Sequence, residues 1–126
     1  MSILHLHQLG QMDRRRRLDA LRDALAGTAD ALLVTKLVNV RWLTGFTGSS
    51  AMALVLPGRL LLVTDGRYRE QAEQQLGAAG VEAEIEITTT PATLFAAATS
   101  PCRQVALEAD DVTWSTVRTA STEWFP

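Results

Sequence analysis

The sequence has few of the features that mark membrane, secreted or disordered proteins. Its longest uninterrupted apolar run, 51–56, has six residues, whereas a membrane-spanning helix needs about 20. Cys102 is the only cysteine, so an internal disulfide is excluded and a reducing compartment fits. With only 8 Gly and 4 Pro in 126 residues, the composition is globular. We therefore expect a cytoplasmic protein with no membrane partner.

Neither sign of charge dominates the chain. Twelve basic and 14 acidic side chains leave a formal charge of −2, which selects no class of partner. The length of 126 residues suits one domain and excludes a second full one. Residues 1–7 lack the positive charge and apolar stretch of a secretory signal, in keeping with the cytoplasmic expectation.

The spacing of apolar residues predicts alternating helices and strands. Helices are expected at 13–26, 66–76, 91–98 and 112–124, and strands at 31–35, 51–56, 60–64, 81–87 and 105–107. The turn residues at 57–59 indicate a hairpin. The uninterrupted apolar strand 31–35 should be central, and the alternating strand 81–87 should lie near an edge. The pattern predicts a mixed α/β sheet of five or six strands with helices on both faces.

Two residues are predicted to cap helices. Asp65 precedes the helix that carries Tyr68, and Thr90 stands before Pro91 at the start of the next. Short oxygen-bearing side chains accept hydrogen bonds from first-turn N–H groups, and proline is favoured in that turn. Arg67 could pair with a carboxylate such as that of Asp65.

No complete catalytic apparatus is visible. His5 and His7 could be two metal ligands, but no third ligand is signalled nearby. The serines at 49–50 lack the G-x-S-x-G pattern of a nucleophile elbow, and Cys102 has no activating partner in the sequence. One acidic group, Glu82, Glu84 and Glu86, is interpreted as the exposed face of a strand. A second group, Glu108, Asp110 and Asp111, could hold a hard cation but is more often found as helix caps. We predict no catalytic residue and no metal site.

The densest charge run is 14–17, four consecutive arginines. Such residues on a helix point about 100° apart, so they do not form one stripe for a phosphate backbone. The sequence supplies no aromatic platform beside them, and we expect a solvated helix start and no nucleic-acid partner.

Segment 39–49 concentrates aromatic residues, two glycines and one charge between two strands. Trp42 and Phe46 lie close to Gly45 and Gly48, and Arg41 is its lone charged residue. One interpretation is a loop whose aromatics fill the core and whose glycines allow positive φ. The other is a rigid loop that exposes Arg41 to something outside the domain.

Segment 39–49, followed by 62–68, resembles the N-terminal domain of the creatinase/prolidase/aminopeptidase P family. The resemblance extends upstream through 30–35 to Leu18 and downstream to Glu108 and Val112-Thr113, so it covers nearly the whole chain. Residues 105–108 depart from the pattern, because relatives often carry a glycine and an aromatic before the acid. The resemblance implies that 1–126 form a ribonuclease H-like N-terminal domain, with the pita-bread catalytic domain absent from this chain.

That resemblance also implies a function: a non-catalytic domain for dimerisation and substrate capping in a metal-dependent Xaa-Pro aminopeptidase or dipeptidase acting on proline-containing peptides. It places two divalent metal ions, often manganese, in the missing catalytic domain. The implied partners of this domain are that catalytic domain and a second copy of the full-length protein. Arg41 and Trp42 fall where relatives approach a neighbouring subunit's substrate, and Arg41 could pair with a peptide carboxylate. Structural roles are implied for Asn39, Gly45, Phe46, Gly48, Asp65, Arg67 and Tyr68.

An alternative remains open from the residues alone. A free-standing α/β module without hydrolase activity could recognise a peptide or partner through Arg41, Trp42 and Phe46. A nucleic-acid binder centred on 14–17 would show steep salt dependence.

Overall fold

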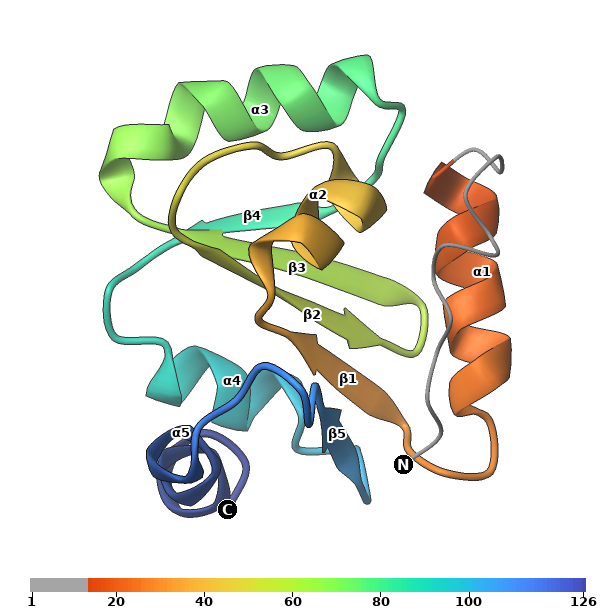
Figure 1. Ribbon diagram of the computed structural model, residues 1–126, viewed down its shortest axis with the longest axis vertical. Coiled ribbons are helices and arrows are strands. Elements are labelled where there is room, and N and C mark those ends of the chain that lie inside the picture. The colour runs from red at the N-terminus through yellow and green to blue at the C-terminus, as the bar shows by residue number, and fades with distance from the viewer. Residues whose placement is uncertain (1–13) are drawn as a thin grey trace.

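The computed structural model describes residues 14–126 as one mixed sheet with helices on both faces (Figure 1). Its elements in chain order are α1 (Arg14–Leu25), β1 (Ala31–Val34), α2 (Leu37–Thr44), β2 (Ala51–Leu56), β3 (Arg59–Thr64), the 3₁₀ turn η2 (Gly66–Tyr68), α3 (Arg69–Ala78), β4 (Glu84–Ile87), α4 (Ala92–Ala98), β5 (Val105–Leu107), α5 (Trp114–Thr119) and the π-helical turn η3 (Ala120–Trp124). None of the helices within 14–126 is long and apolar enough to cross a bilayer.

The sheet has five strands in the order β4-β3-β2-β1-β5. The pairs β1–β2 and β2–β3 are antiparallel, and β1–β5 and β3–β4 are parallel. This confirms the mixed α/β sheet predicted from the sequence. Strand β1 is paired on both sides and buried along its length, and β4 forms one edge, as the apolar run and the alternating pattern predicted.

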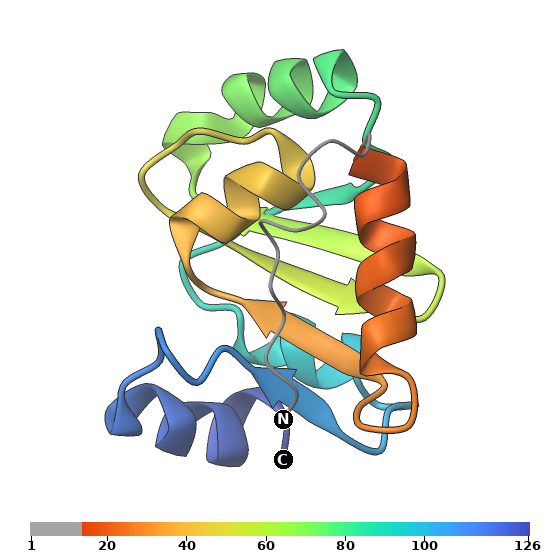
Figure 2. The ribbon, with the colours of Figure 1, turned by 45° about the vertical axis from the view of Figure 1, so that its right-hand side comes forward.

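Strands β2 and β3 form the predicted hairpin. Leu56 lies opposite Arg59, so Pro57 and Gly58 make the turn, and Gly58 has a φ of 70°. Arg22 of α1 donates from Nε to the Leu56 carbonyl at 3.0 Å and from Nη2 to the Arg59 carbonyl at 2.7 Å. These bonds fasten α1 beside the turn (Figure 2).

Successive strand residues point to opposite faces, so the sheet divides the core into two layers. On one face α1, α2 and α3 cover the sheet, with Leu21, Val40 and Leu76 in the packing. On the other face the buried ring of Phe95 from α4 stacks on Phe125, with ring centroids 5.6 Å apart. The C-terminal turn therefore packs onto α4.

Two details differ from the sequence prediction. The strand predicted from residue 81 begins at Glu84, because Gly80 takes a φ of 69° and the Val81 N–H donates to the Leu76 carbonyl, prolonging the turn after α3. Thr90 does not cap α4. Its N–H donates to Thr88 Oγ1, and the residue before the helix is Pro91, which has no side chain able to cap.

Candidate functional site

The prediction that segment 39–49 is a loop is wrong for its first half. Leu37–Thr44 form helix α2, and only residues 45–50 connect it to β2. Gly45 ends the helix at a φ of 83°, and its N–H donates to the Arg41 carbonyl at 2.7 Å. A Cβ at this position would lie 3.0 Å from the Ala79 Cβ. Glycine is therefore required both by the left-handed conformation and by the close approach of α3.

Glu108, at the end of β5, holds the start of α2. The residue before the helix, Lys36, makes no side-chain cap. Instead Glu108 Oε1 accepts the N–H groups of Thr35 and Lys36 at 2.5 and 2.8 Å, and its Oε2 accepts Asn39 Nδ2 at 2.5 Å. Asp111 accepts the Thr35 hydroxyl at 2.6 Å. These carboxylates thus satisfy groups at a helix start about 70 residues away, which fixes α2 against the sheet.

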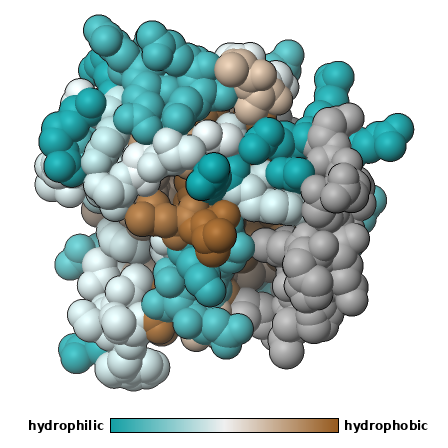
Figure 3. Space-filling model, turned by 45° about the horizontal axis from the view of Figure 1, so that its top comes forward, coloured by the Kyte–Doolittle hydropathy of each residue, from teal (hydrophilic) through white to brown (hydrophobic). Residues whose placement is uncertain are grey.

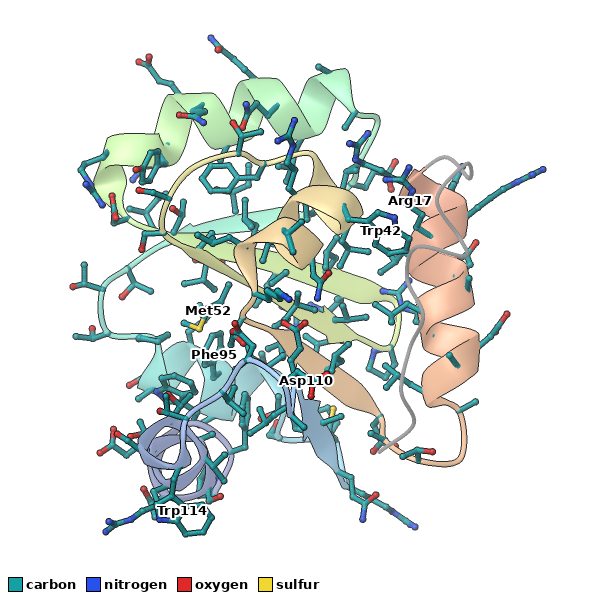
Figure 4. The ribbon with its side chains drawn as sticks, viewed as in Figure 1. Arg17, Trp42, Met52, Phe95, Asp110 and Trp114 are labelled. Atoms are coloured by element: carbon teal, nitrogen blue, oxygen red, sulfur yellow. The ribbon has the colours of Figure 1, made fainter. Side chains whose placement is uncertain are left out.

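Helix α1 holds the other end of α2. Arg17 Nη1 donates to the Trp42 carbonyl at 2.7 Å, and its guanidinium carbon lies 5.0 Å from the centre of the Trp42 ring (Figure 4). A cation near a helix C-terminus complements the helix dipole, and the ring face adds a cation–π contact. The interpretation of 14–17 as a solvated helix start is therefore wrong for Arg17.

The short connection after α2 is tied to α3 and packed on the core. The Thr47 N–H donates to Gln75 Oε1 at 2.9 Å, and Gln75 Nε2 donates to Thr47 Oγ1 at 2.8 Å. Phe46 is only 1% exposed, and a Cβ on Gly48 would lie 2.2 Å from the Phe46 Cζ. The connection can follow this course only because residue 48 has no side chain.

Ser49 joins this connection to η2. Its Oγ lies 2.5 Å from Tyr68 Oη, and this hydrogen bond lowers the pKa of Tyr68 from its usual value. The Tyr68 ring meets the Phe46 ring edge-on, with centroids 5.7 Å apart. Ser49 and Tyr68 therefore fasten the connection to η2, which follows the end of β3.

Asp65 accepts the Arg67 N–H at the start of η2, at 3.0 Å. It also receives the Arg67 guanidinium in a two-point contact at 3.0 and 2.9 Å. The hydrogen bonds from Arg67 lower the pKa of Asp65 below its usual range. Both side chains are thus engaged with each other within the domain.

Arg41 differs from the residues around it, because its side chain points outward from a firmly held helix. It is exposed and forms no ion pair within residues 14–126. Leu37 and Val38, four and three positions before it, share its side of α2 and are 39% and 61% exposed. Figure 3 shows a hydrophobic patch surrounded by mostly hydrophilic surface. A cation beside apolar side chains suits an anionic group that is attached to an apolar one.

The structure does not place Trp42 and Phe46 on a shared surface with Arg41. Trp42 is partly buried against the α1–α2–α3 side of the core, and Phe46 is inside it. The alternative of peptide recognition through all three side chains is therefore wrong in its use of Phe46.

Sequence reasoning missed the residues that hold α2 and the connection after it. The sequence predicts a helix cap or a cation ligand for Glu108, together with its acidic neighbours, and does not indicate that Glu108 anchors α2. Gln71 and Gln75 were not singled out, although their spacing of four on a helix puts both on one side. Both contact Thr47 Oγ1.

The described residues do not fit a metal ion. Within 14–126 there is no group of three or more His, Cys, Asp or Glu side chains placed to hold one. Glu108 and Asp111 use their oxygens on α2, and Glu84 is paired with Arg59 at 2.8 and 3.0 Å, which lowers the pKa of Glu84. The two histidines, His5 and His7, lie outside the described residues.

Comparison with known proteins identifies the class to which this fold belongs. The family described as Creatinase/Prolidase N-terminal domain matches residues 17–124. Since the match covers most of the chain, the chain belongs to this family.

The similar proteins are named as peptidases or as N-terminal domains of peptidases. The N-terminal domain of the cytoplasmic peptidase PepQ from Mycobacterium tuberculosis is 33% identical, with 86% of this chain and 82% of that one covered and a TM-score of 0.71. The N-terminal domain of a metallopeptidase from Corynebacterium diphtheriae is 31% identical, with 89% of each chain covered and a TM-score of 0.73. Over 47 residues, 37% of this chain, the peptidase YqhT of Bacillus subtilis is 45% identical, and the match spans only 13% of its length.

Proposed function

We propose that this chain is the non-catalytic N-terminal domain of a metal-dependent Xaa-Pro aminopeptidase or dipeptidase, and that it caps the substrate site of a neighbouring subunit. Family membership supports the proposal that the chain is part of a peptidase, since the similar proteins include N-terminal domains of proteins named as a peptidase and a metallopeptidase. The described residues hold no metal-ligand group. Two metal ions, with manganese as the expected element, belong in this proposal to the catalytic domain.

The observation that carries the capping role is the placement of Arg41. Glu108 fixes one end of α2 and Arg17 the other, so the backbone that bears Arg41 is held at both ends. The held backbone limits the region that the Arg41 side chain can reach, and its guanidinium can form two hydrogen bonds with a carboxylate. In the proposed role Arg41 pairs with the C-terminal carboxylate of a short peptide. The family resemblance also implies substrate contact for Trp42, whereas in the structure the Arg17 guanidinium lies over the Trp42 ring.

Two further parts of the proposal concern assembly and location. Capping a neighbour's site requires two copies, so the working form is a homodimer joined through the full-length protein. Cytoplasmic location is proposed from the single cysteine and from the likeness to a protein described as a cytoplasmic peptidase.

The test is kinetic and uses the protein that includes the catalytic domain. Arg41→Ala should raise KM for a Xaa-Pro dipeptide about tenfold or more, because it removes a charge-assisted contact. A long peptide with the same first two residues places its carboxylate far from Arg41. Its KM should therefore change less than about twofold.

Two variants control for indirect effects. Arg118→Ala removes an exposed arginine from α5 and should leave both substrates unaffected. Arg41→Lys keeps the charge but loses the paired donors, so its KM for the dipeptide should fall between those of the parent and Arg41→Ala. Equal losses for short and long peptides would reject the carboxylate role of Arg41.

A further inference from the structure

A cavity of about 280 Å³ lies on a different part of the domain from the exposed side of α2. It is lined by α1 from Arg14 to Arg22, by Leu43 of α2, by the turn between β2 and β3, and by the connection from α3 to β4. Apolar side chains form part of its lining, namely Leu18, Leu43, Leu60 and Val81. Arg41 does not line it, so the substrate-capping role proposed above makes no use of it.

Positive charge predominates around this cavity. Four arginines line it against two carboxylates; the arginines are Arg14, Arg15, Arg22 and Arg59, and the carboxylates are Asp19 and Glu82. Arg14, Leu18 and Arg22 are spaced by four, so α1 presents them on one side. Arg59 comes from the hairpin turn, so the guanidinium groups approach from two separate elements.

Part of that charge is not compensated by ion pairs within residues 14–126. Arg59 is paired with Glu84, but Arg22 donates to carbonyl oxygens, which are neutral. Arg14 and Arg15 form no ion pair there. Arg14 also lines the cavity, although its buried Nε, which has no hydrogen-bond partner, lies beside Gly45 outside that lining.

We propose that this cavity binds the phosphate group of a small molecule. A phosphate offers oxygens to several guanidinium groups at once, and arginine suits that geometry. The cavity is close to the lower end of the volumes found for small-molecule sites, and its apolar lining can receive an organic substituent. Asp19 and Glu82 at the same cavity would repel the further phosphates of a nucleic acid chain, so the structure favours a single phosphate group.

The experiment is a nuclear magnetic resonance titration of the ¹⁵N-labelled 126-residue chain with phenyl phosphate and, separately, with inorganic phosphate. We expect saturable shifts of the amides at 58–60 and 80–82, which line the cavity, with a Kd of about 1 mM or lower. Tighter binding of phenyl phosphate assigns the site to an organic phosphate, and equal binding assigns it to free phosphate. No saturable shift with either probe at about 20 mM would overturn the proposal.

Variants separate this site from a general attraction to positive charge. Arg15→Gln should weaken binding about tenfold, whereas Arg16→Gln removes the same charge from a neighbouring residue that does not line the cavity and should change it little. Asp19→Asn should tighten binding, because it removes a repelling carboxylate. Arg15 and Asp19 are both exposed, so these substitutions should leave the domain folded. Equal weakening by Arg15→Gln and Arg16→Gln would contradict a defined site.

Discussion

Glu108→Ala is expected to lower the free energy of unfolding by about 2–3 kcal/mol, the scale of losing hydrogen bonds to a charged group. The carboxylate accepts the Thr35 and Lys36 N–H groups and the Asn39 side chain. Alanine leaves these donors at the start of α2 without their acceptor. Urea denaturation followed by circular dichroism measures the loss, and hydrogen exchange should show α2 opening more readily than β2.

Two substitutions make this prediction specific to the anchoring contact. Asp110→Ala removes a neighbouring exposed carboxylate and should change stability by less than about 0.5 kcal/mol. Glu108→Gln keeps an acceptor oxygen for the backbone N–H groups and should recover about half of the loss, since hydrogen bonds to neutral groups are weaker. If Glu108→Ala is as stable as Asp110→Ala, Glu108 does not anchor α2.

Gly48→Ala is expected to destabilise the domain by about 2–3 kcal/mol, the range of an overpacked core. The new methyl group would lie 2.2 Å from Cζ and 2.7 Å from Cε2 of Phe46. Phe46 is buried and packs edge-on against Tyr68, so the ring cannot move aside without disturbing the core. Thermal and urea unfolding measure the effect.

Gly77→Ala is the matched control, with an expected effect of opposite sign. Gly77 lies within α3, and no atom would lie within 4 Å of its added Cβ. Alanine there should stabilise the domain by about 0.5–1 kcal/mol, because it favours the helix.

In a Phe46→Leu background the cost of Gly48→Ala should become smaller, since the two residues are in contact. An unchanged cost would show that the Phe46 ring is not its cause.

The sheet could be predicted from the sequence because its signals are local. The apolar runs and the Pro57-Gly58 turn lie within the hairpin that they specify, and the alternation at 84–87 reports one wet face of an edge strand. The same holds for Asp65, whose cap reaches only two residues along the chain.

Helix α2 could not be predicted in the same way. It has eight residues, and Lys36 before it gives no capping signal. A short helix without a cap is unstable by itself. What stabilises it comes from far along the chain, since Glu108 is 72 residues from Lys36 and Arg17 is 25 residues from Trp42.

The long distance along the chain between contacting residues also limited what could be predicted of the candidate site. One of the two interpretations of segment 39–49 exposes Arg41 to something outside the domain, and the structure does expose Arg41, but on a helix instead of a loop. The arginine run was interpreted from its own spacing alone. Arg17 donates to the Trp42 carbonyl, and Arg22 donates to the Leu56 and Arg59 carbonyls. These bonds depend on how α1 packs against α2 and the hairpin, which the spacing of the arginines does not indicate.

A peptidase assay on the purified 126-residue chain tests the central claim most directly. The chain is incubated with a Xaa-Pro dipeptide and manganese, and released amino acid is measured beside an intact Xaa-Pro dipeptidase as a positive control. We expect no hydrolysis above the uncatalysed rate, because residues 14–126 contain no metal-ligand group. Turnover by this chain, abolished by a chelator, would place the reactive machinery here and contradict the account.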